Sequence, residues 1–94
     1  METRVKVEFI GVFREMTGTT GLILRMEGQA TLRQVVRKLA DEFGKDLEDR
    51  ILQGDSMTED VLVILNGRSI RAPDANAVTI DDGDSLVFAP ESAP

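Results

Sequence analysis

The sequence contains no cysteine, histidine, tryptophan or tyrosine. Without cysteine and histidine there are no disulfides, no thiolate or imidazole nucleophiles, and none of the usual zinc and copper ligands. The only aromatic residues are 4 phenylalanines and the formal net charge is −6, so a basic groove with stacking platforms for nucleic acid is disfavoured. These absences exclude much enzyme chemistry, and we expect no metal or cofactor.

Long apolar runs are missing as well. The longest are about five or six residues, too short to span a membrane, and the chain opens Met1-Glu2-Thr3-Arg4 without an apolar signal region. These features predict a soluble cytoplasmic protein. A length of 94 residues with 41% hydrophobic content is enough for a single core. We expect one domain over residues 1–90 and a flexible tail over 91–94.

The stretch from Thr31 to Gly44 predicts the central helix. Thr31 and Gln34 can form a capping box at its start, and Gly44 can end it in the left-handed conformation. A helix this short is unstable alone, so its apolar face must pack on a sheet. That face consists of residues spaced i, i+3, i+4, i+7, i+8 and i+11, namely Leu32, Val35, Val36, Leu39, Ala40 and Phe43.

Two strands are predicted before this helix. Residues 4–9 alternate charged and apolar, with Val5, Val7 and Phe9 on one face. Residues 22–26 alternate in the same way. The stretch between the strands, residues 13–21, has no clear period and ends in a cluster of turn residues, so we expect a loop that joins an antiparallel pair.

The chain after the helix is richer in turns. A weak helical turn around Leu47, Ile51 and Leu52 is closed by Gly54 and followed by a polar loop over residues 55–60. The apolar run 61–65 predicts a central strand.

Three features complete this half of the chain. Asn66-Gly67 is a strong hairpin signal that returns the chain along residues 68–71. A brief extended piece follows over residues 78–80. The last strand covers residues 85–89, and we expect Pro90 to end it.

One helix between a leading hairpin and a trailing set of strands predicts an α+β domain. We expect a mixed sheet of about four or five strands with the main helix packed on one face. Residues 4–9 and 85–89 should lie side by side near the centre of this sheet.

Three short motifs surround the central helix: FREMTG at residues 13–18, LNGRSI at 65–70 and DGDSLVFAP at 82–90. Each is common alone, but their order and spacing resemble the ubiquitin-like β-grasp family of small sulfur carriers. That family includes the molybdopterin synthase small subunit, the thiamin-pathway carrier and the small archaeal modifiers. The resemblance runs from about Val5 to Pro90 and implies the β-grasp fold.

The resemblance also implies a reactive tail. In such proteins a flexible C-terminus ends in Gly-Gly, and a ubiquitin-activating-type enzyme adenylates its carboxylate before it becomes a thiocarboxylate or is joined to a lysine. Residues without side chains can thread a narrow channel. The present sequence has no Gly-Gly pair and closes Glu91-Ser92-Ala93-Pro94. Because proline adds bulk and a fixed φ, we expect Ala93 and Pro94 to impair adenylation at this carboxylate.

The apolar run 61–65 also suggests a partner-binding surface. One face of the sheet meets the helix, which leaves Leu62 or Ile64 beside Val87 on the other face unless something covers them. The resemblance implies that this face and the tail dock an activating enzyme or the large molybdopterin synthase subunit. Simple burial on both faces is the alternative. The candidate partner-binding residues are Leu62, Ile64, Val87, Phe88 and Pro90, with Ala93 and Pro94 at the tail terminus.

Two functional hypotheses follow from these patterns. The first is a carrier subunit in molybdopterin or related sulfur-transfer biosynthesis, which contributes a terminal acyl group and no catalytic side chains. The resemblance thus implies a protein that is not itself an enzyme and is at most the carrier subunit of one. The second is a ubiquitin-like protein modifier, or a non-reactive binding module that has lost carrier chemistry. The acidic turn over residues 81–84 lacks the ligand spacing of a calcium loop and is predicted to be a solvated turn.

Overall fold

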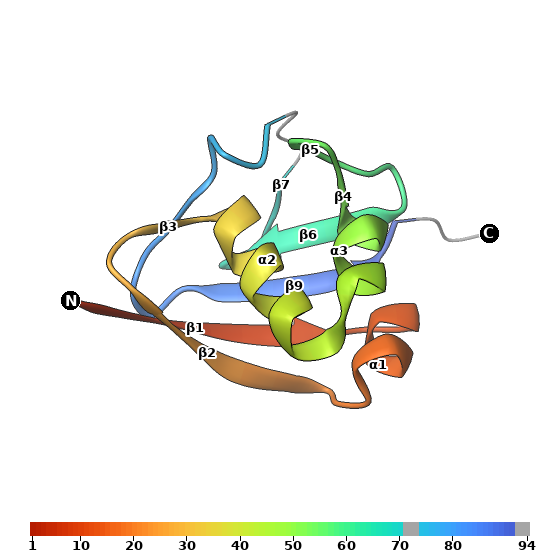
Figure 1. The fold of residues 1–94 in the computed structure, drawn as a ribbon, viewed down its shortest axis with the longest axis horizontal. Helices are drawn as coiled ribbons and strands as arrows, with labels where there is room; N and C mark the ends of the chain where they lie inside the picture. Colours follow the sequence, from red (N-terminus) through yellow and green to blue (C-terminus); the bar gives the residue numbers. More distant parts are fainter. Residues whose placement is uncertain (71–73, 92–94) are drawn as a thin grey trace.

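The computed structural model describes residues 1–70 and 74–91. A five-stranded mixed sheet has the order β2-β1-β9-β6-β7, and helices α2 and α3 lie across one face of it (Figure 1). The central strands β1 and β9 are parallel, whereas the other neighbouring pairs are antiparallel. This arrangement confirms the predicted α+β sheet. The strands are β1 (Glu2–Phe9), β2 (Gly21–Glu27), β6 (Val61–Leu65), β7 (Arg68–Ile70) and β9 (Ser85–Pro90).

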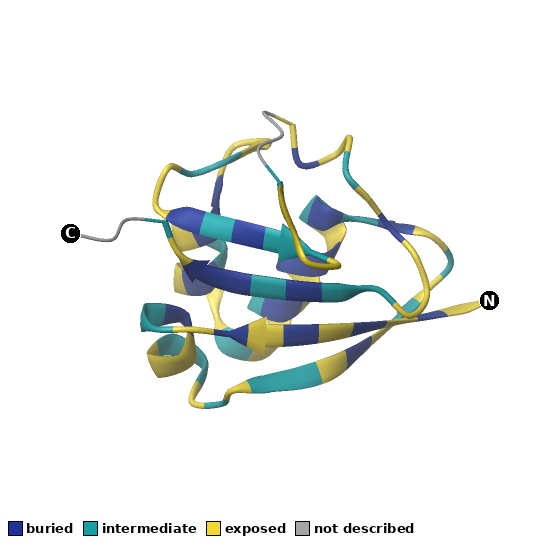
Figure 2. Cartoon of the chain, turned by 180° about the vertical axis from the view of Figure 1, so that it is seen from behind, coloured by how far each residue is buried: buried dark blue, intermediate teal, exposed yellow. Residues whose placement is uncertain are grey.

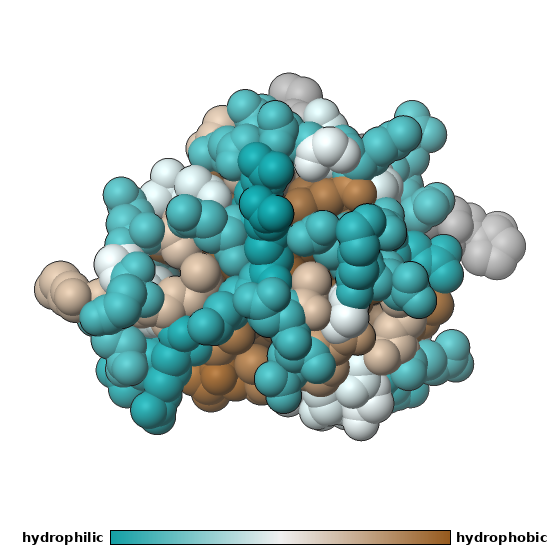
Figure 3. All heavy atoms as spheres, viewed as in Figure 1, coloured by the Kyte–Doolittle hydropathy of each residue, from teal (hydrophilic) through white to brown (hydrophobic). Residues whose placement is uncertain are grey.

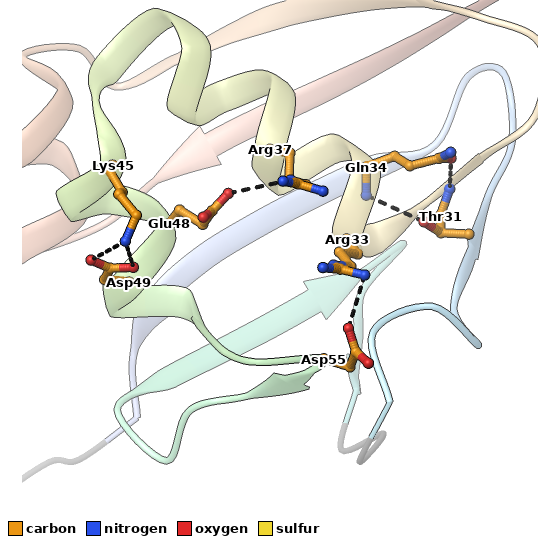
Figure 4. A network of polar contacts seen from close by, with 8 residues as sticks. All are labelled: Thr31, Arg33, Gln34, Arg37, Lys45, Glu48, Asp49 and Asp55. Carbon is orange, nitrogen blue, oxygen red and sulfur yellow. Dashed lines mark hydrogen bonds and ion pairs between the residues drawn. The ribbon is translucent and has the colours of Figure 1, made fainter.

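Helix α2 (Leu32–Phe43) has the predicted bounds and the predicted capping box. The Thr31 hydroxyl accepts from the Gln34 amide at 3.2 Å, and the Gln34 side-chain oxygen accepts from the Thr31 amide at 2.9 Å (Figure 4). Gly44 ends the helix at φ 103° and ψ 162° rather than in the expected left-handed helical conformation. The reason is that the chain does not leave the helix layer there, but turns directly into α3 (Lys45–Ile51).

The core lies between α2 and the sheet. Leu39 is 0% exposed, as its position on the apolar face predicted. The Phe9 ring stacks on Phe88 at a centroid distance of 6.2 Å and meets the edge of Phe43 at 5.8 Å. Each large side chain buried in this way contributes about 1.5–3 kcal/mol, which supplies the sheet support that a short helix needs.

Exposed ion pairs join α2 to the segments beside it. Arg33 contacts Asp55 at 2.9 Å and Arg37 contacts Glu48 of α3 at 3.7 Å (Figure 4). Ion pairs on the surface contribute about 0–1 kcal/mol each to stability, so they affect the orientation of these segments more than the stability of the fold. Among the described helices, none is both long enough and apolar enough to cross a membrane.

Residues 12–17 form a short helix, α1 (Val12–Thr17), where the sequence analysis expected a loop. Gly11, at φ 64°, lets the chain turn out of β1, and Gly18 ends the helix at φ 73° in the left-handed conformation. Phe13 is buried in the core, whereas Arg14 and Glu15 are exposed. A single buried side chain gives no helical period, so the pattern did not reveal this element.

Two further expectations about turns were wrong. Gly54 does not close a helix, because α3 ends before Leu52; it lies in a turn at φ 65° between β4 (Leu52–Gln53) and β5 (Ser56–Met57). The expected polar loop thus begins with a small hairpin.

The predicted Asn66-Gly67 turn is confirmed, with φ of 51° and 84°. A second small sheet pairs β3 (Ala30–Thr31) with β8 (Thr79–Ile80).

Pro90 continues the last strand, contrary to the expectation that it would end it. It lies opposite Val61 in the pairing of β9 with β6, and the next amide, that of Glu91, donates to the Asp60 carbonyl at 3.0 Å. Successive residues of a strand point their N–H groups to opposite sides, so the proline nitrogen faces away from β6, beyond the last residue of β1. The predicted tail residues Ser92, Ala93 and Pro94 lie outside the described part of the chain.

Candidate functional site

The outer face of the sheet, turned away from α2, carries an apolar strip on its two adjacent strands β6 and β9. Ile64 lies opposite Val87, and Leu62 lies opposite Ala89. These four residues are called the outer strip below. Leu62, Ile64 and Val87 are half-buried, and Figure 2 shows only buried and intermediate residues on β6 and on β9 before its last residue.

The structure brings together three of the predicted partner-binding residues, Leu62, Ile64 and Val87. Phe88 was a wrong choice, because its side chain is 0% exposed and stacks on Phe9 in the core. Successive strand residues point to opposite faces, so the neighbour of an outward Val87 must face inward. Pro90 is exposed but lies on the same face as Phe88, at the end of β9.

The sequence analysis missed two residues here, Ala89 within the outer strip and Ile10 at its border. Ala89 is 8% exposed and is not part of the core cluster. Ile10 is 48% exposed, and its amide donates to the Phe88 carbonyl at 2.9 Å, so it lies beside β9 just past the end of β1. The signal for Ile10 was the alternation of β1, because the residue after an inward Phe9 points outward.

The end of β9 packs against the start of α1. A side-chain carbon added to Gly11 would lie 2.9 Å from Cγ of Pro90, closer than such atoms approach in proteins. Glycine at this position therefore allows Pro90 to sit directly on the turn that leaves β1. This contact fixes where the C-terminal segment leaves the domain relative to the outer strip.

The carboxylates of Asp82 and Asp84, in the acidic turn at residues 81–84, accept hydrogen bonds from other groups of the protein. Asp82 accepts from the Arg4 amide at 2.8 Å and its carboxylate lies 3.8 Å from the Arg4 guanidinium. Asp84 accepts from the Asp81 amide at 2.8 Å and from the Asn66 side chain at 3.0 Å. These carboxylates tie the turn to β1 and to the β6–β7 hairpin, and the described residues contain no acidic cluster arranged to hold a metal ion.

Comparison with known proteins begins with the sequence. No protein-family model matches it. One relative, small archaeal modifier protein 3 from Haloferax volcanii, is 32% identical over 87 residues, which cover 92% of this chain and 94% of the relative. The alignment therefore includes almost the whole of both chains.

Solved structures agree with this relationship. The solution structure of the Haloferax volcanii HVO 2177 protein matches with a TM-score of 0.82 and 29% identity, over 98% of this chain and 86% of that one. A putative molybdopterin converting factor subunit 1 from Pyrococcus furiosus matches with a TM-score of 0.75 and 22% identity, over 96% and 99% of the two chains, a likeness of fold. The fold is the ubiquitin-like β-grasp, and the protein belongs to the small archaeal modifier family.

Proposed function

We propose that this protein acts as a small modifier or sulfur carrier that presents two features to a partner enzyme, the outer strip and the C-terminal segment after Pro90. The observation that supports this most is their continuity. Val87 and Ala89 of the strip lie on β9, the same strand that leads into the C-terminal segment. A partner seated on the strip would therefore receive the segment from a fixed origin.

The partner we propose is an adenylating enzyme of the ubiquitin-activating type, or the large subunit of molybdopterin synthase. Apolar contact on the strip would supply affinity, since half-buried aliphatic side chains lose their remaining contact with water on docking. The segment beyond Pro90 would then extend into the active site by up to about 3.3–3.6 Å per residue. The protein itself contributes the acyl group and the docking surface, and the catalytic side chains belong to the enzyme.

The product of activation distinguishes two variants of this function. The name of the Haloferax volcanii relative favours attachment to other proteins, whereas the name of the Pyrococcus furiosus neighbour favours sulfur delivery in molybdopterin synthesis. An acyl adenylate is the common intermediate. A lysine amine attacks its carbonyl carbon in the first case and a sulfur donor does so in the second, and AMP leaves in both. A non-reactive binding module would dock in the same way and form no adenylate.

Docking is tested by Ile64→Asp, which places a charge in the centre of the outer strip. The matched control is Ile23→Asp on the same sheet face, because Ile23 is 56% exposed on β2. We expect Ile64→Asp to weaken binding to a cognate adenylating enzyme by at least about tenfold, which corresponds to 1.4 kcal/mol, and the control to leave it within about twofold. Equal effects of the two variants would contradict docking on the strip.

Activation is tested separately with two defined C-termini. One chain ends at Pro94 and the other continues with two glycines, and each is incubated with the enzyme and ATP before intact-mass analysis. We expect both to bind and only the extended chain to gain an AMP adduct, because the bulk and fixed φ of a terminal proline would not fit a channel that admits residues without side chains. Efficient adenylation of the chain ending at Pro94 would overturn this steric argument, and absence of binding by both would overturn the docking proposal.

A further inference from the structure

The turn between β6 and β7 consists of Asn66 and Gly67, two residues whose groups can react with each other. The Gly67 amide nitrogen, once deprotonated, can attack Cγ of the Asn66 side chain, because glycine has no side chain to hinder the approach. A C–N bond forms, the bond from Cγ to Nδ2 breaks and ammonia leaves, which closes a five-membered succinimide ring. Water then opens the ring at either carbonyl and leaves aspartate or isoaspartate. The net reaction adds water and releases ammonia.

In the folded chain the Asn66 side chain is held against the start of β9. Its Oδ1 accepts from the Ser85 amide at 2.9 Å, and its Nδ2 donates to the Asp84 carboxylate at 3.0 Å. The Asn66 backbone amide also donates to the Ser85 carbonyl at 2.9 Å. An ionised carboxylate only accepts and a backbone N–H only donates, so these partners fix the orientation of the side-chain amide. Rotation of Cγ toward the Gly67 nitrogen would break both side-chain bonds.

The turn is nevertheless open to water, which the reaction requires. Asn66 and Gly67 are both exposed. Hydrophilic side chains predominate at the end of the molecule near the N-terminus, where Figure 1 places the start of β9 (Figure 3). Protection of Asn66 therefore depends on its hydrogen bonds rather than on burial.

The hairpin that carries this turn is the part of the sheet that opens most readily. Among the described strands, β7 has only β6 as a neighbour, and it is three residues long. Its residues are exposed or half-buried, so little apolar surface holds it in place. Segments with few buried contacts open locally while the rest of a protein stays folded. Such an opening would release Asn66 from β9.

We propose that Asn66 is a deamidation site controlled by the fold, which reacts slowly while the β6–β7 hairpin is closed and rapidly once the hairpin opens. The inference rests on this turn alone and does not depend on the proposed function.

The products do not restore the closed hairpin. Aspartate at position 66 places a second carboxylate where an amide group donated to Asp84, so two like charges face each other. Isoaspartate adds a carbon to the backbone of a two-residue turn, which then no longer fits the register of β6 and β7. The modification is thus a permanent mark on a chain whose hairpin has opened.

Two other sites of the chain serve as internal comparisons. Asn76 is also exposed, but alanine follows it, and a Cβ hinders attack by the next nitrogen. The Asp82-Gly83 pair can form the same ring by loss of water, but the Gly83 amide donates to the Arg4 carbonyl at 2.8 Å. Isomerisation of Asp82 also leaves the mass unchanged, whereas deamidation exchanges NH for O and raises it.

The first experiment compares the folded and the unfolded chain. The full chain is incubated in one mildly alkaline buffer with and without guanidinium chloride, and fragmentation of its peptides assigns each mass increase to a residue. We expect Asn66 to react at least about tenfold more slowly in the folded chain, the ratio that 1.4 kcal/mol of opening free energy gives. In guanidinium chloride Asn66 should react at least about tenfold faster than Asn76, because glycine follows only Asn66.

Variants at Asp84 test the hydrogen bond to Nδ2. Asp84→Ala removes the acceptor, and Asp84→Asn keeps an oxygen in its place as the matched control. We expect Asp84→Ala to raise the rate in the folded chain by at least about threefold and Asp84→Asn to change it by less than about twofold. In guanidinium chloride both variants should react at the rate of the unchanged chain, because the bond is absent there.

The consequence of deamidation is tested with Asn66→Asp, which is one of the two products. It should lower the equilibrium constant of folding by at least about fivefold more than Asn76→Asp, which adds the same charge to an exposed residue. Denaturant unfolding of the two variants measures this difference.

Several results would overturn the proposal. Equal rates in the folded and unfolded chain would show that the hairpin gives no protection. A folded-state rate that Asp84→Ala leaves unchanged would show that the bond to Nδ2 has no part in it. Absence of reaction at Asn66 in guanidinium chloride, or equal stability of the two aspartate variants, would contradict the chemistry or its consequence.

Discussion

The outer face of the sheet has two halves that differ in chemistry although they share one fold. Strand β1 places Arg4, Lys6 and Glu8 outward, and these residues are exposed. Strands β9 and β6 place Val87 and Ile64 at equivalent outward positions, and these are half-buried. Figure 2 shows β1 alternating between buried and exposed residues, in contrast to its neighbour β9.

This difference shows that the fold does not require apolar residues on the outer face. Strand β1 has a neighbour on each side, as β9 does, and its inward residues are equally buried. It nevertheless tolerates a fully charged outward side. The apolar residues of the outer strip are therefore better explained by contact with a partner than by a need of the sheet.

The largest effect is expected below both halves, in the shared core. Leu39→Ala should lower the free energy of unfolding by about 2–5 kcal/mol, because it leaves a cavity between α2 and the sheet. Denaturant unfolding followed at amides of β2 and β6 should show the same loss in both. Asp41→Ala, on the exposed side of α2, is the control and should change stability by less than about 0.5 kcal/mol. Loss in one half alone would mean that the halves have separate cores.

The next effect is expected at Gly11, between the end of β1 and the end of β9. Gly11→Ala should cost about 1–3 kcal/mol through backbone strain, with the overlap on Pro90 in addition. Gly28→Ala is the matched control, since Gly28 also has a positive φ, of 68°, but no atom within 4 Å of an added Cβ. Thermal unfolding of the two variants compares strain with and without overlap. A loss of stability in Gly11→Ala that is smaller than the loss in Gly28→Ala would show that Pro90 moves aside.

A third experiment replaces the outer strip by polar residues of similar shape. Ile64→Thr with Val87→Thr should cost only about 1 kcal/mol at each site, because both side chains are half-buried and the fold does not need them. Chemical denaturation measures this cost, and the enzyme-binding assay should show a much larger loss. If stability fell by more than about 4 kcal/mol, the strip would belong to the core and the contrast between the halves would fail.

The smallest effect is expected in the charged half. Asp82→Asn keeps an oxygen for the Arg4 amide and removes the charge from the pair with the Arg4 guanidinium. The expected loss is about 0–1 kcal/mol at low salt and less at high salt, where exposed pairs are screened. Stability measured at two salt concentrations tests this. The same variant at Asp60, which forms no ion pair in the described structure, should show no salt-dependent loss.

Elements with a clear period or a strong turn signal could be predicted from sequence. Helix α2 carries both its apolar face and its capping residues, and the Asn66-Gly67 turn follows a continuous apolar run. Helix α1 could not be predicted, because Phe13 is its only fully buried residue. Gly54 was misread since a glycine after a helical turn looks the same whether it ends the helix or opens a hairpin.

The candidate site was predicted in part. Strand alternation identified Leu62, Ile64 and Val87, and the same alternation should have excluded Phe88. The place of Ile10 was harder to foresee, because it depends on the pairing of Ile10 with β9, far away in the sequence. The local alternation predicts to which face of the sheet a residue points. Which strands become neighbours depends on pairing between distant parts of the sequence.

Strand β9 connects the two parts of the sheet, since the β1–β2 hairpin and the β6–β7 hairpin meet only through it. Its parallel register sets Val7 beside Leu86, so β1 pairs with β9 only after every other strand of this sheet has been made. A chain interrupted before β9 cannot close the sheet. Only a completely folded molecule can therefore present its C-terminal segment in the proposed geometry, which would keep unfinished chains away from the activating enzyme.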